Sequence, residues 1–221
     1  KGALNAATTV SGLTAVGRDA LAANTSGTNN TAVGAYSLGA NTTGAQNVAV
    51  GSAALDANTT GDYNTALGYQ SLSANTTADS NTALGFKSML ANTTGTANVA
   101  VGDSALRANT TTSNNTAVGF SALTANTAGA NLVAVGYGAL DANTTASYNV
   151  GMGYNALGVN TTGEFNVAIG GNSLDANVDT SNNVAVGHNA LTANTAHNNT
   201  AVGFEALDTN STGTRNTSVG S

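Results

Sequence analysis

The chain has 221 residues, of which five are basic and eleven acidic, giving a formal net charge of −6 at pH 7. This balance argues against nucleic-acid binding, because a phosphate backbone needs a basic face. Cysteine is absent, so the redox compartment cannot be inferred from disulfides. No apolar stretch approaches the ~18 residues of a membrane-spanning helix. We therefore expect neither a nucleic-acid partner nor insertion into a membrane.

A seventeen-residue repeat fills the chain. Residues 35–51 are a clean copy, and we number its positions as slots 1 to 17, so that Leu38 occupies slot 4 and Asn47 slot 13. Slot 17 is glycine in all thirteen copies: Gly17, Gly34, Gly51, Gly68, Gly85, Gly102, Gly119, Gly136, Gly153, Gly170, Gly187, Gly203 and Gly220. A fixed period indicates a repeat architecture. We expect one repeat domain over 1–221, forming a segment of a longer fibrous protein.

Within each coil, slots 3–6 are the first expected strand, because slot 4 is leucine in twelve coils and methionine in the other. Slots 10–12 are expected to form an outer turn that tolerates side chains, and the single one-residue deletion, within 195–199, falls there. Slots 14 and 16 carry mostly β-branched residues, as suits one face of a second strand. Proline is absent, as ladders between coils require. The prediction is an all-β parallel β-solenoid (a β-roll), in which slot 17 turns a corner with positive φ or lets another backbone come close.

The side chains expected inside the coil are those at slots 4, 6, 14 and 16, as in Leu38, Ala40, Val48 and Val50. Slot 15 then faces outward, because successive side chains of a strand point to opposite sides. It is alanine in eleven coils, and an exposed row has no reason to stay so small unless another surface comes close. We therefore expect contacts between chains, most simply in a threefold bundle, at Ala32, Ala49, Ala66, Ala83, Ala100, Ala117, Ala134, Ala168 and Ala185. The alternative is that slot 15 is interior because the coil is too narrow for more.

Asparagine fills slot 7 in twelve coils, with Ala7 the exception, and slot 13 in eleven. Identical amides about 4.7–4.8 Å apart can bond to one another along the axis, so both slots are predicted to form asparagine ladders. The alternative is N-glycosylation, since Asn41 begins an Asn-Thr-Thr sequon, yet asparagine persists where the sequon fails, as at Asn126. Slot 8 is threonine in eleven coils, as expected for hydroxyls that cap a turn or, alternatively, for an ice-binding row.

The titratable residues show no constellation for catalysis or metal binding. His188 and His197 share a coil without a cysteine or clustered carboxylates at ligand spacing, and we expect them to be solvated turn residues. Slot 5 carries four aspartates, which are expected to keep an outer face polar rather than act as a paired acid and base: Asp56, Asp141, Asp175 and Asp208. We therefore expect no enzyme activity, no cofactor and no metal.

Any recognition should lie at the variable slots 1, 2, 5, 11 and 12. Slot 1 carries aromatic residues in stripes along the coils, which could bind a glycan or a protein: Tyr69, Phe86, Phe120, Tyr137, Tyr154 and Phe204. The alternative is that each ring covers the glycine corner before it or packs between chains.

The ends of several coils carry a family resemblance. The runs at 47–51 and 98–102 (Asn-Val-Ala-Val-Gly) and at 166–170 (Asn-Val-Ala-Ile-Gly) resemble the head repeat of YadA-like trimeric autotransporter adhesins. The resemblance implies a left-handed parallel β-roll, three chains side by side and binding to host matrix or to other cells. The longer phrase over 115–127 also resembles arrays in tail-fibre-type proteins of phages and bacteria.

These observations lead to one main functional expectation. The chain is expected to be a structural and adhesive fibre segment, extracellular and displayed on a cell or virion, that forms a rigid rod and presents a binding surface. Its expected partners are copies of itself, as a homotrimer or filament, and a cell-surface glycan or protein. The alternatives are a self-assembling extracellular filament subunit and an ice-binding β-solenoid that uses threonine rows.

Overall fold

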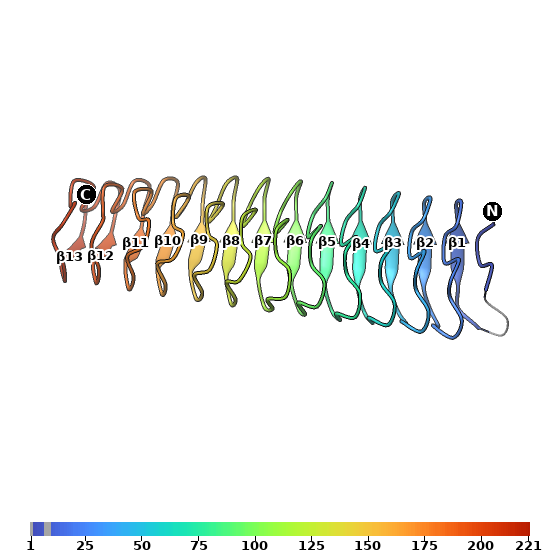
Figure 1. Cartoon of the computed structure of the whole chain (residues 1–221). Coiled ribbons are helices and arrows are strands. Elements are labelled where there is room, and N and C mark those ends of the chain that lie inside the picture. The colour runs from blue at the N-terminus through green and yellow to red at the C-terminus, as the bar shows by residue number, and fades with distance from the viewer. Residues whose placement is uncertain (1, 7–9) are drawn as a thin grey trace. The chain divides into compact units, whose positions relative to one another are not determined.

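The computed structural model describes residues 2–6 and 10–221, so Ala7, the exception at slot 7, lies outside the described residues. Each coil contributes one strand of three residues at slots 14–16, and the described residues contain no helix (Figure 1). The strands are β1 (Thr14–Val16), β2 (Thr31–Val33), β3 (Val48–Val50), β4 (Thr65–Leu67), β5 (Thr82–Leu84), β6 (Val99–Val101), β7 (Thr116–Val118), β8 (Val133–Val135), β9 (Val150–Met152), β10 (Val167–Ile169), β11 (Val184–Val186), β12 (Thr200–Val202) and β13 (Thr217–Val219). The chain divides into two compact units, Lys1–Ser113 with β1–β6 (unit 1) and Asn114–Ser221 with β7–β13 (unit 2), and each is described by itself.

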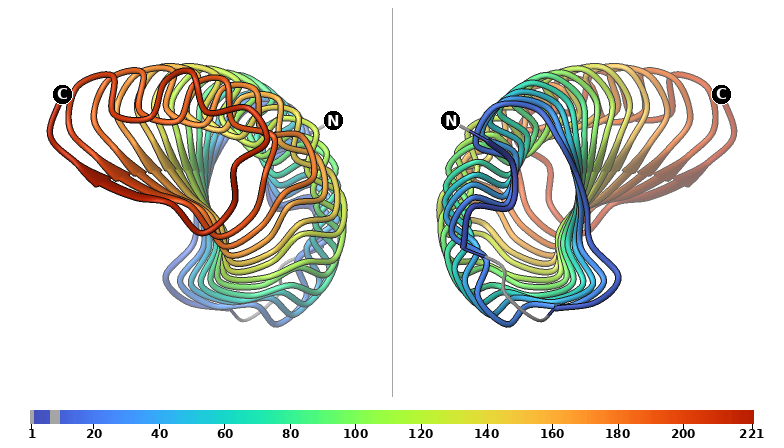
Figure 2. Two further views of the ribbon diagram at one scale, coloured as in Figure 1. Left: turned by 90° about the vertical axis from the view of Figure 1, so that its left-hand side faces the viewer. Right: turned by 90° about the vertical axis from the view of Figure 1, so that its right-hand side faces the viewer.

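Parallel pairing in register stacks the coils within each unit. Neighbouring strands follow the chain order and align equal slots, as where Val48 lies opposite Thr65. Backbone hydrogen bonds between neighbouring coils continue through the turns; for example, the N–H of Tyr36 donates to the carbonyl oxygen of Arg18 at 2.8 Å. Each unit is therefore a parallel β-solenoid, which confirms the predicted fold class. The end views in Figure 2 show the strand as one side of each coil.

Slots 1–6 are a succession of tight turns where the sequence predicts a second strand. Slots 2 and 4 have a positive φ, for example 63° at Tyr36 and 48° at Leu38. A strand needs extended backbone, so the prediction for slots 3–6 is wrong. The reason is that leucine rarely adopts the left-handed region, so that no sequence signal announces it. The side chain at slot 4 is nevertheless buried as predicted, as Leu38 and Met89 show.

Glycine at slot 17 turns the corner at the end of every strand, with φ between 127° and 140°. A Cβ at Gly51 would lie 2.5 Å from the carbonyl oxygen of Gly68 in the next coil, closer than real Cβ atoms approach. Both reasons predicted for glycine at this slot, the positive φ and the nearby backbone, are therefore present together.

The two sides of the strand are inverted relative to the prediction. Ala49 at slot 15 is fully buried, whereas Val48 at slot 14 is 39% exposed and Val50 at slot 16 is half-buried. The interior is narrow at this level: at slot 15 of β9, a Cβ on Gly151 would lie 3.2 Å from Cγ of Leu140 at slot 4. Leucine from slot 4 thus fills the coil and leaves room only for a small residue, which confirms the alternative of a narrow interior.

The predicted contact between chains through slot 15 is consequently wrong. The residues assigned to it are fully buried inside their own coils and offer no surface to a partner: Ala32, Ala49, Ala66, Ala83, Ala100, Ala117, Ala134, Ala168 and Ala185. Slot 6 also differs from the prediction, because Ala40 is half-buried rather than enclosed. The interior is instead lined by slots 3, 4, 7, 10, 13 and 15.

Slot 10 belongs to this interior rather than to an outer turn. Gly44 is buried there, and Ala146 and Thr180 are 1% and 4% exposed. In the short coil, Nδ2 of Asn194 at slot 7 donates to the carbonyl oxygen of Ala196 at 2.7 Å, as slot 7 does to slot 10 elsewhere. Ala196 therefore occupies slot 10, and the missing residue belongs to slot 9, whose side chains point to solvent.

Two asparagine rows cross the interior. At slot 7, Nδ2 of Asn41 donates to Oδ1 of Asn24 in the preceding coil at 2.7 Å and to the carbonyl oxygen of Gly44 at 2.9 Å. At slot 13, Oδ1 of Asn30 accepts from the backbone N–H of Asn47 at 2.9 Å, and its Nδ2 donates to the oxygen of Gly44 at 2.7 Å. The amide-to-amide ladder is thus confirmed at slot 7, while slot 13 joins amides to backbone. Asn41 is fully buried, which leaves no space for a glycan on its sequon.

Candidate functional site

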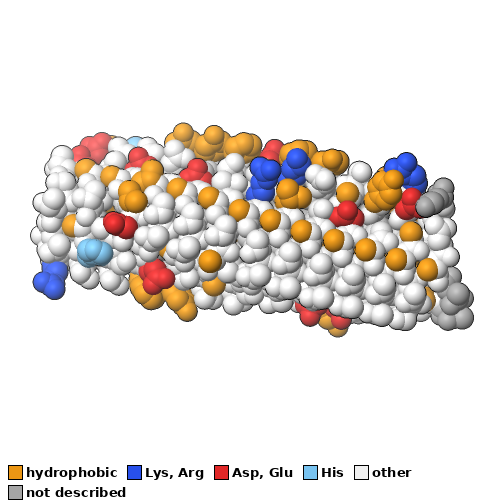
Figure 3. Space-filling model, viewed as in Figure 1, with side chains coloured by type: hydrophobic (Ala, Val, Ile, Leu, Met, Phe, Trp, Pro, Cys, Tyr) orange, Lys and Arg blue, Asp and Glu red, His pale blue; other side chains and the backbone are white. Residues whose placement is uncertain are grey.

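The outward side chains at slots 14 and 16 form two rows along each unit, which we call the strand face. Slot 14 carries threonine or valine, and slot 16 carries valine, leucine, isoleucine or methionine. All are half-buried or exposed, and Leu67, Met152 and Ile169 are 41%, 39% and 39% exposed. In β8–β11 the face is apolar throughout: Val133, Val135, Val150, Met152, Val167, Ile169, Val184 and Val186. On the side drawn in Figure 3, small hydrophobic side chains follow one another from coil to coil in a row.

The aromatic residues predicted as a contact stripe lie on the surface at slot 1. Within unit 1, Tyr69 stacks on Phe86 with ring centroids 5.6 Å apart. Within unit 2, Tyr137 stacks on Phe120 at 5.3 Å and on Tyr154 at 5.4 Å. The exposed fractions range from 47% to 56% over the six rings, Tyr69, Phe86, Phe120, Tyr137, Tyr154 and Phe204. The structure thus brings the predicted residues of each unit into stacks, and Phe204 stacks on His188 at 5.8 Å.

Stacking decides what these rings can bind. Neighbouring ring planes lie within 14° of parallel, so the faces cover one another and the edges point outward. The edge of an aromatic ring carries partial positive charge, and the face carries partial negative charge. A continuous stack therefore offers edges and tyrosine hydroxyls. Ring faces, which the apolar side of a sugar needs, are free only where a stack ends.

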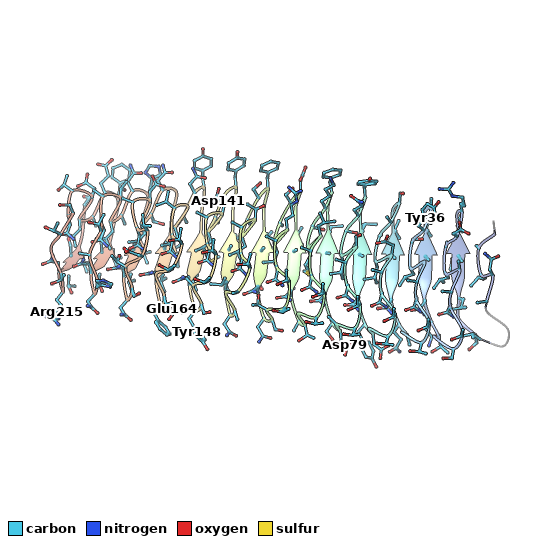
Figure 4. All side chains as sticks on the ribbon, viewed as in Figure 1. Tyr36, Asp79, Asp141, Tyr148, Glu164 and Arg215 are labelled. Carbon is cyan, nitrogen blue, oxygen red and sulfur yellow. The ribbon has the colours of Figure 1, made fainter. Side chains whose placement is uncertain are left out.

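A second aromatic row, at slot 12, was not among the predicted site residues. Tyr148 and Phe165 stack 5.2 Å apart with planes 4° from parallel, and both are more than half exposed, as is Tyr63. Figure 4 places Tyr148 at the opposite edge of its coil from Asp141. The sequence contains the information needed to predict this row, because Tyr148 and Phe165 occupy the variable slot 12 in successive coils.

The threonine hydroxyls at slot 8 are used inside the solenoid. Oγ1 of Thr42 donates to the carbonyl oxygen of Thr59 at 3.0 Å, and Oγ1 of Thr59 donates to that of Thr76 at 3.0 Å. This is the capping role predicted for a turn. Because these hydroxyls donate their hydrogens to the next coil, they present only lone pairs to solvent.

The side chains at slot 11 cap the backbone of the preceding coil. Nδ1 of His197 accepts from the N–H of Ser181 at 2.9 Å, and Oδ1 of Asp62 accepts from the N–H of Ala45 at 2.7 Å. This gives His197 a structural hydrogen bond where the sequence predicts a solvated turn residue. Among the described residues, no group of three or more His, Cys, Asp or Glu side chains could hold a metal ion.

The four slot-5 aspartates are half-buried and lie in separate coils. Oδ1 of Asp56 accepts from Oγ of Ser73 at 2.7 Å. Burial raises the pKa of Asp141 and of Asp175 above the usual value for aspartate, and for Asp141 two backbone N–H groups partly oppose this rise. No two of these carboxylates sit in adjacent coils.

Within the described part of the chain, no helix is long and apolar enough to cross a membrane. Comparison with protein-family models, with curated proteins and with solved structures found no match to this chain. Its function must therefore be inferred from its own surfaces.

Proposed function

We propose that the chain is a structural and adhesive fibre segment that associates side by side with copies of itself through the strand face. The observation that supports this function is the strand face itself: two uncharged rows of mostly apolar side chains that leave no polar groups for solvent except threonine hydroxyls. Exposed apolar patches of this extent are typical of protein contact surfaces.

The area of the strand face suits a stable contact. Unit 2 alone contributes two outward side chains from each of its seven strands. A standard interface buries about 800 Å² on each partner, so a contact of that size needs the outward side chains of many successive coils, as the strand face provides.

A second copy of this chain is the partner that fits the strand face best. Its rows repeat once per coil, so a partner must carry the same repeat to meet every row, and another copy does so by construction. The face bears no charge, so the net charge of −6 does not oppose contact there. Three copies and an extracellular position on a cell or virion are what the resemblance to YadA-like and tail-fibre repeats favours, and both are part of the proposal.

Light scattering with matched variants tests this association. Met152→Lys with Ile169→Lys places two charges on the strand face, where each side chain is 39% exposed. Val159→Lys places one at slot 6, where the side chain is 41% exposed, and serves as the control. We expect the unaltered protein and the control to have a multiple of the chain mass of 21.4 kDa, and the double variant to have the single-chain mass. A single-chain mass for the unaltered protein would contradict the proposal, and continuous filaments in electron microscopy would favour the filament alternative.

A further inference from the structure

The slot-1 row of unit 2 lacks one ring. In chain order this row carries Phe120, Tyr137, Tyr154, Gly171, His188 and Phe204. Tyr154 ends the first stack and His188 begins the second. Gly171, which lies between them, has no side chain, so the facing sides of these two rings are not covered by a ring of the row.

The spacing of the coils leaves room for about one ring beside Gly171. In the two stacks, one coil separates ring centroids by 5.3 to 5.8 Å. Two coils therefore separate Tyr154 from His188 by about twice a stacking distance, so that an inserted ring would contact both faces. The imidazole leans toward this space, because Cδ2 of His188 lies 3.3 Å from the position of a Cβ on Gly171.

Asparagine occupies slot 2, beside this space, in three consecutive coils and in no other coil of the sequence: Asn155, Asn172 and Asn189. All three side chains are partly exposed. Within the described part of the chain their amides make no hydrogen bonds, unlike the amides at slots 7 and 13. The rings of Tyr154 and His188 are therefore bordered by amide donors and acceptors that no described residue uses.

Carboxylates of slot 5 approach the same edge. At Gly138, which occupies slot 2, a Cβ would lie 2.5 Å from Oδ1 of Asn155 in the next coil and 3.8 Å from Oδ2 of Asp141 at slot 5. Asn172 and Asp175 occupy the same two slots, 2 and 5, in the coil that carries Gly171. A carboxylate accepts hydrogen bonds from hydroxyls, and it repels an anionic ligand.

We propose that the gap at Gly171 binds one uncharged pyranose ring of a glycan, held between the ring faces of Tyr154 and His188. The amides of Asn172 and Asn189 and the carboxylate of Asp175 bond to its hydroxyls. A sugar fits better than a flat aromatic compound, because an aromatic compound would leave these polar groups unused. The inference rests on the proposed adhesive function and names the ligand of that function.

Saturation-transfer NMR and titration with the methyl glycosides of glucose, galactose and N-acetylglucosamine test the site in the full chain. Gly171→Phe inserts the ring that other coils carry at slot 1, and the backbone there does not need glycine, since its φ is ordinary. We expect this variant and Tyr154→Ala to weaken binding by about tenfold or more. Asn172→Ala should weaken it several-fold with the stack intact, and Tyr69→Ala, in the other unit's stack, should leave it unchanged.

Binding that survives Gly171→Phe would overturn the proposal, as would the absence of binding by all three glycosides. Binding of indole with no binding of sugars would assign the gap to aromatic ligands and would also overturn it. Light scattering on the same samples separates this inference from the self-association. If the unaltered protein has a multiple of the single-chain mass but binds none of the sugars, only the proposed sugar site is wrong. If it binds a sugar but has the single-chain mass, only the proposed self-association is wrong.

Discussion

Two adjacent glycines allow a sharp test of how the coils are stacked. Gly170 occupies slot 17 with φ 133°, and a Cβ there would approach the backbone of Gly187 and His188 in the next coil, with the carbonyl oxygen of Gly187 nearest. Gly171 has an ordinary φ, and the nearest atom to its added Cβ is Cδ2 of the movable His188 side chain, at 3.3 Å. The substitutions Gly170→Ala and Gly171→Ala are chemically identical and one residue apart. The difference between their effects on the free energy of unfolding therefore measures what the corner at slot 17 requires.

The strained backbone conformation at Gly170 should cost about 1–3 kcal/mol, and displacement of the next coil adds to it, so we expect Gly170→Ala to lower the free energy of unfolding by about 3 kcal/mol or more. Gly171→Ala should change it by less than about 0.5 kcal/mol. Urea denaturation followed by circular dichroism measures both. Equal losses of stability for the two variants would refute the stacking described here, because they would show that the corner does not need glycine.

Three further predictions concern the interior and the slot-5 edge. Asn75→Ala removes amide bonds to both neighbouring coils and should cost about 2–4 kcal/mol in urea denaturation, whereas a loss near zero would show that the ladder contributes nothing. Ala100→Val overfills slot 15 and should cost about 1–3 kcal/mol, while Val99→Thr on the strand face should stay within about 0.5 kcal/mol, and the reverse order would contradict the inverted strand. Because burial raises the folded-state pKa of Asp141, ionisation destabilises the fold as the pH rises through that pKa. Asp141→Asn should therefore be slightly more stable than the parent at neutral pH, by less than about 0.5 kcal/mol, and equal to it below the ordinary value of 3.8. A thermal-melting series over pH measures the difference, and a pH-independent difference would contradict the assignment.

The repeat made the fold predictable. Glycine at slot 17 and asparagine at slot 7 recur because one backbone corner and one amide ladder recur, so a period of 17 residues and a β-solenoid follow from the sequence alone. The burial of Leu38 could also be foreseen, because slot 4 is a large apolar residue in all thirteen coils.

The direction of the strand could not be predicted in the same way. Alternation states that Ala49 and its neighbours Val48 and Val50 face opposite sides, but it does not state which side is inside. Which side of the strand faces the interior depends on the width of the coil, and leucine at slot 4 sets that width. This leucine has a positive φ that no sequence rule anticipates. The expected contact through alanine was wrong for this reason, and the contact that we propose instead uses the apolar strand face.

The surface features were predictable only as rows of residues. The sequence places aromatic residues at slot 1, but the stacking of their faces and the gap beside Tyr154 depend on the spacing of the coils. That the amide of Asn172 is unbonded, whereas that of Asn41 is bonded on both sides, is likewise a matter of geometry and not of residue type.

Thiol labelling tests most directly whether copies of the chain cover the strand face. The chain has no cysteine, so single substitutions report on single positions. Ile169→Cys lies on the strand face and Val159→Cys lies at slot 6, and the native side chains are 39% and 41% exposed in one chain. We predict that at high protein concentration an alkylating reagent labels the first variant several-fold more slowly than the second, and that dilution removes the difference. Equal labelling rates at all concentrations would show an open strand face and would contradict the proposed side-by-side association.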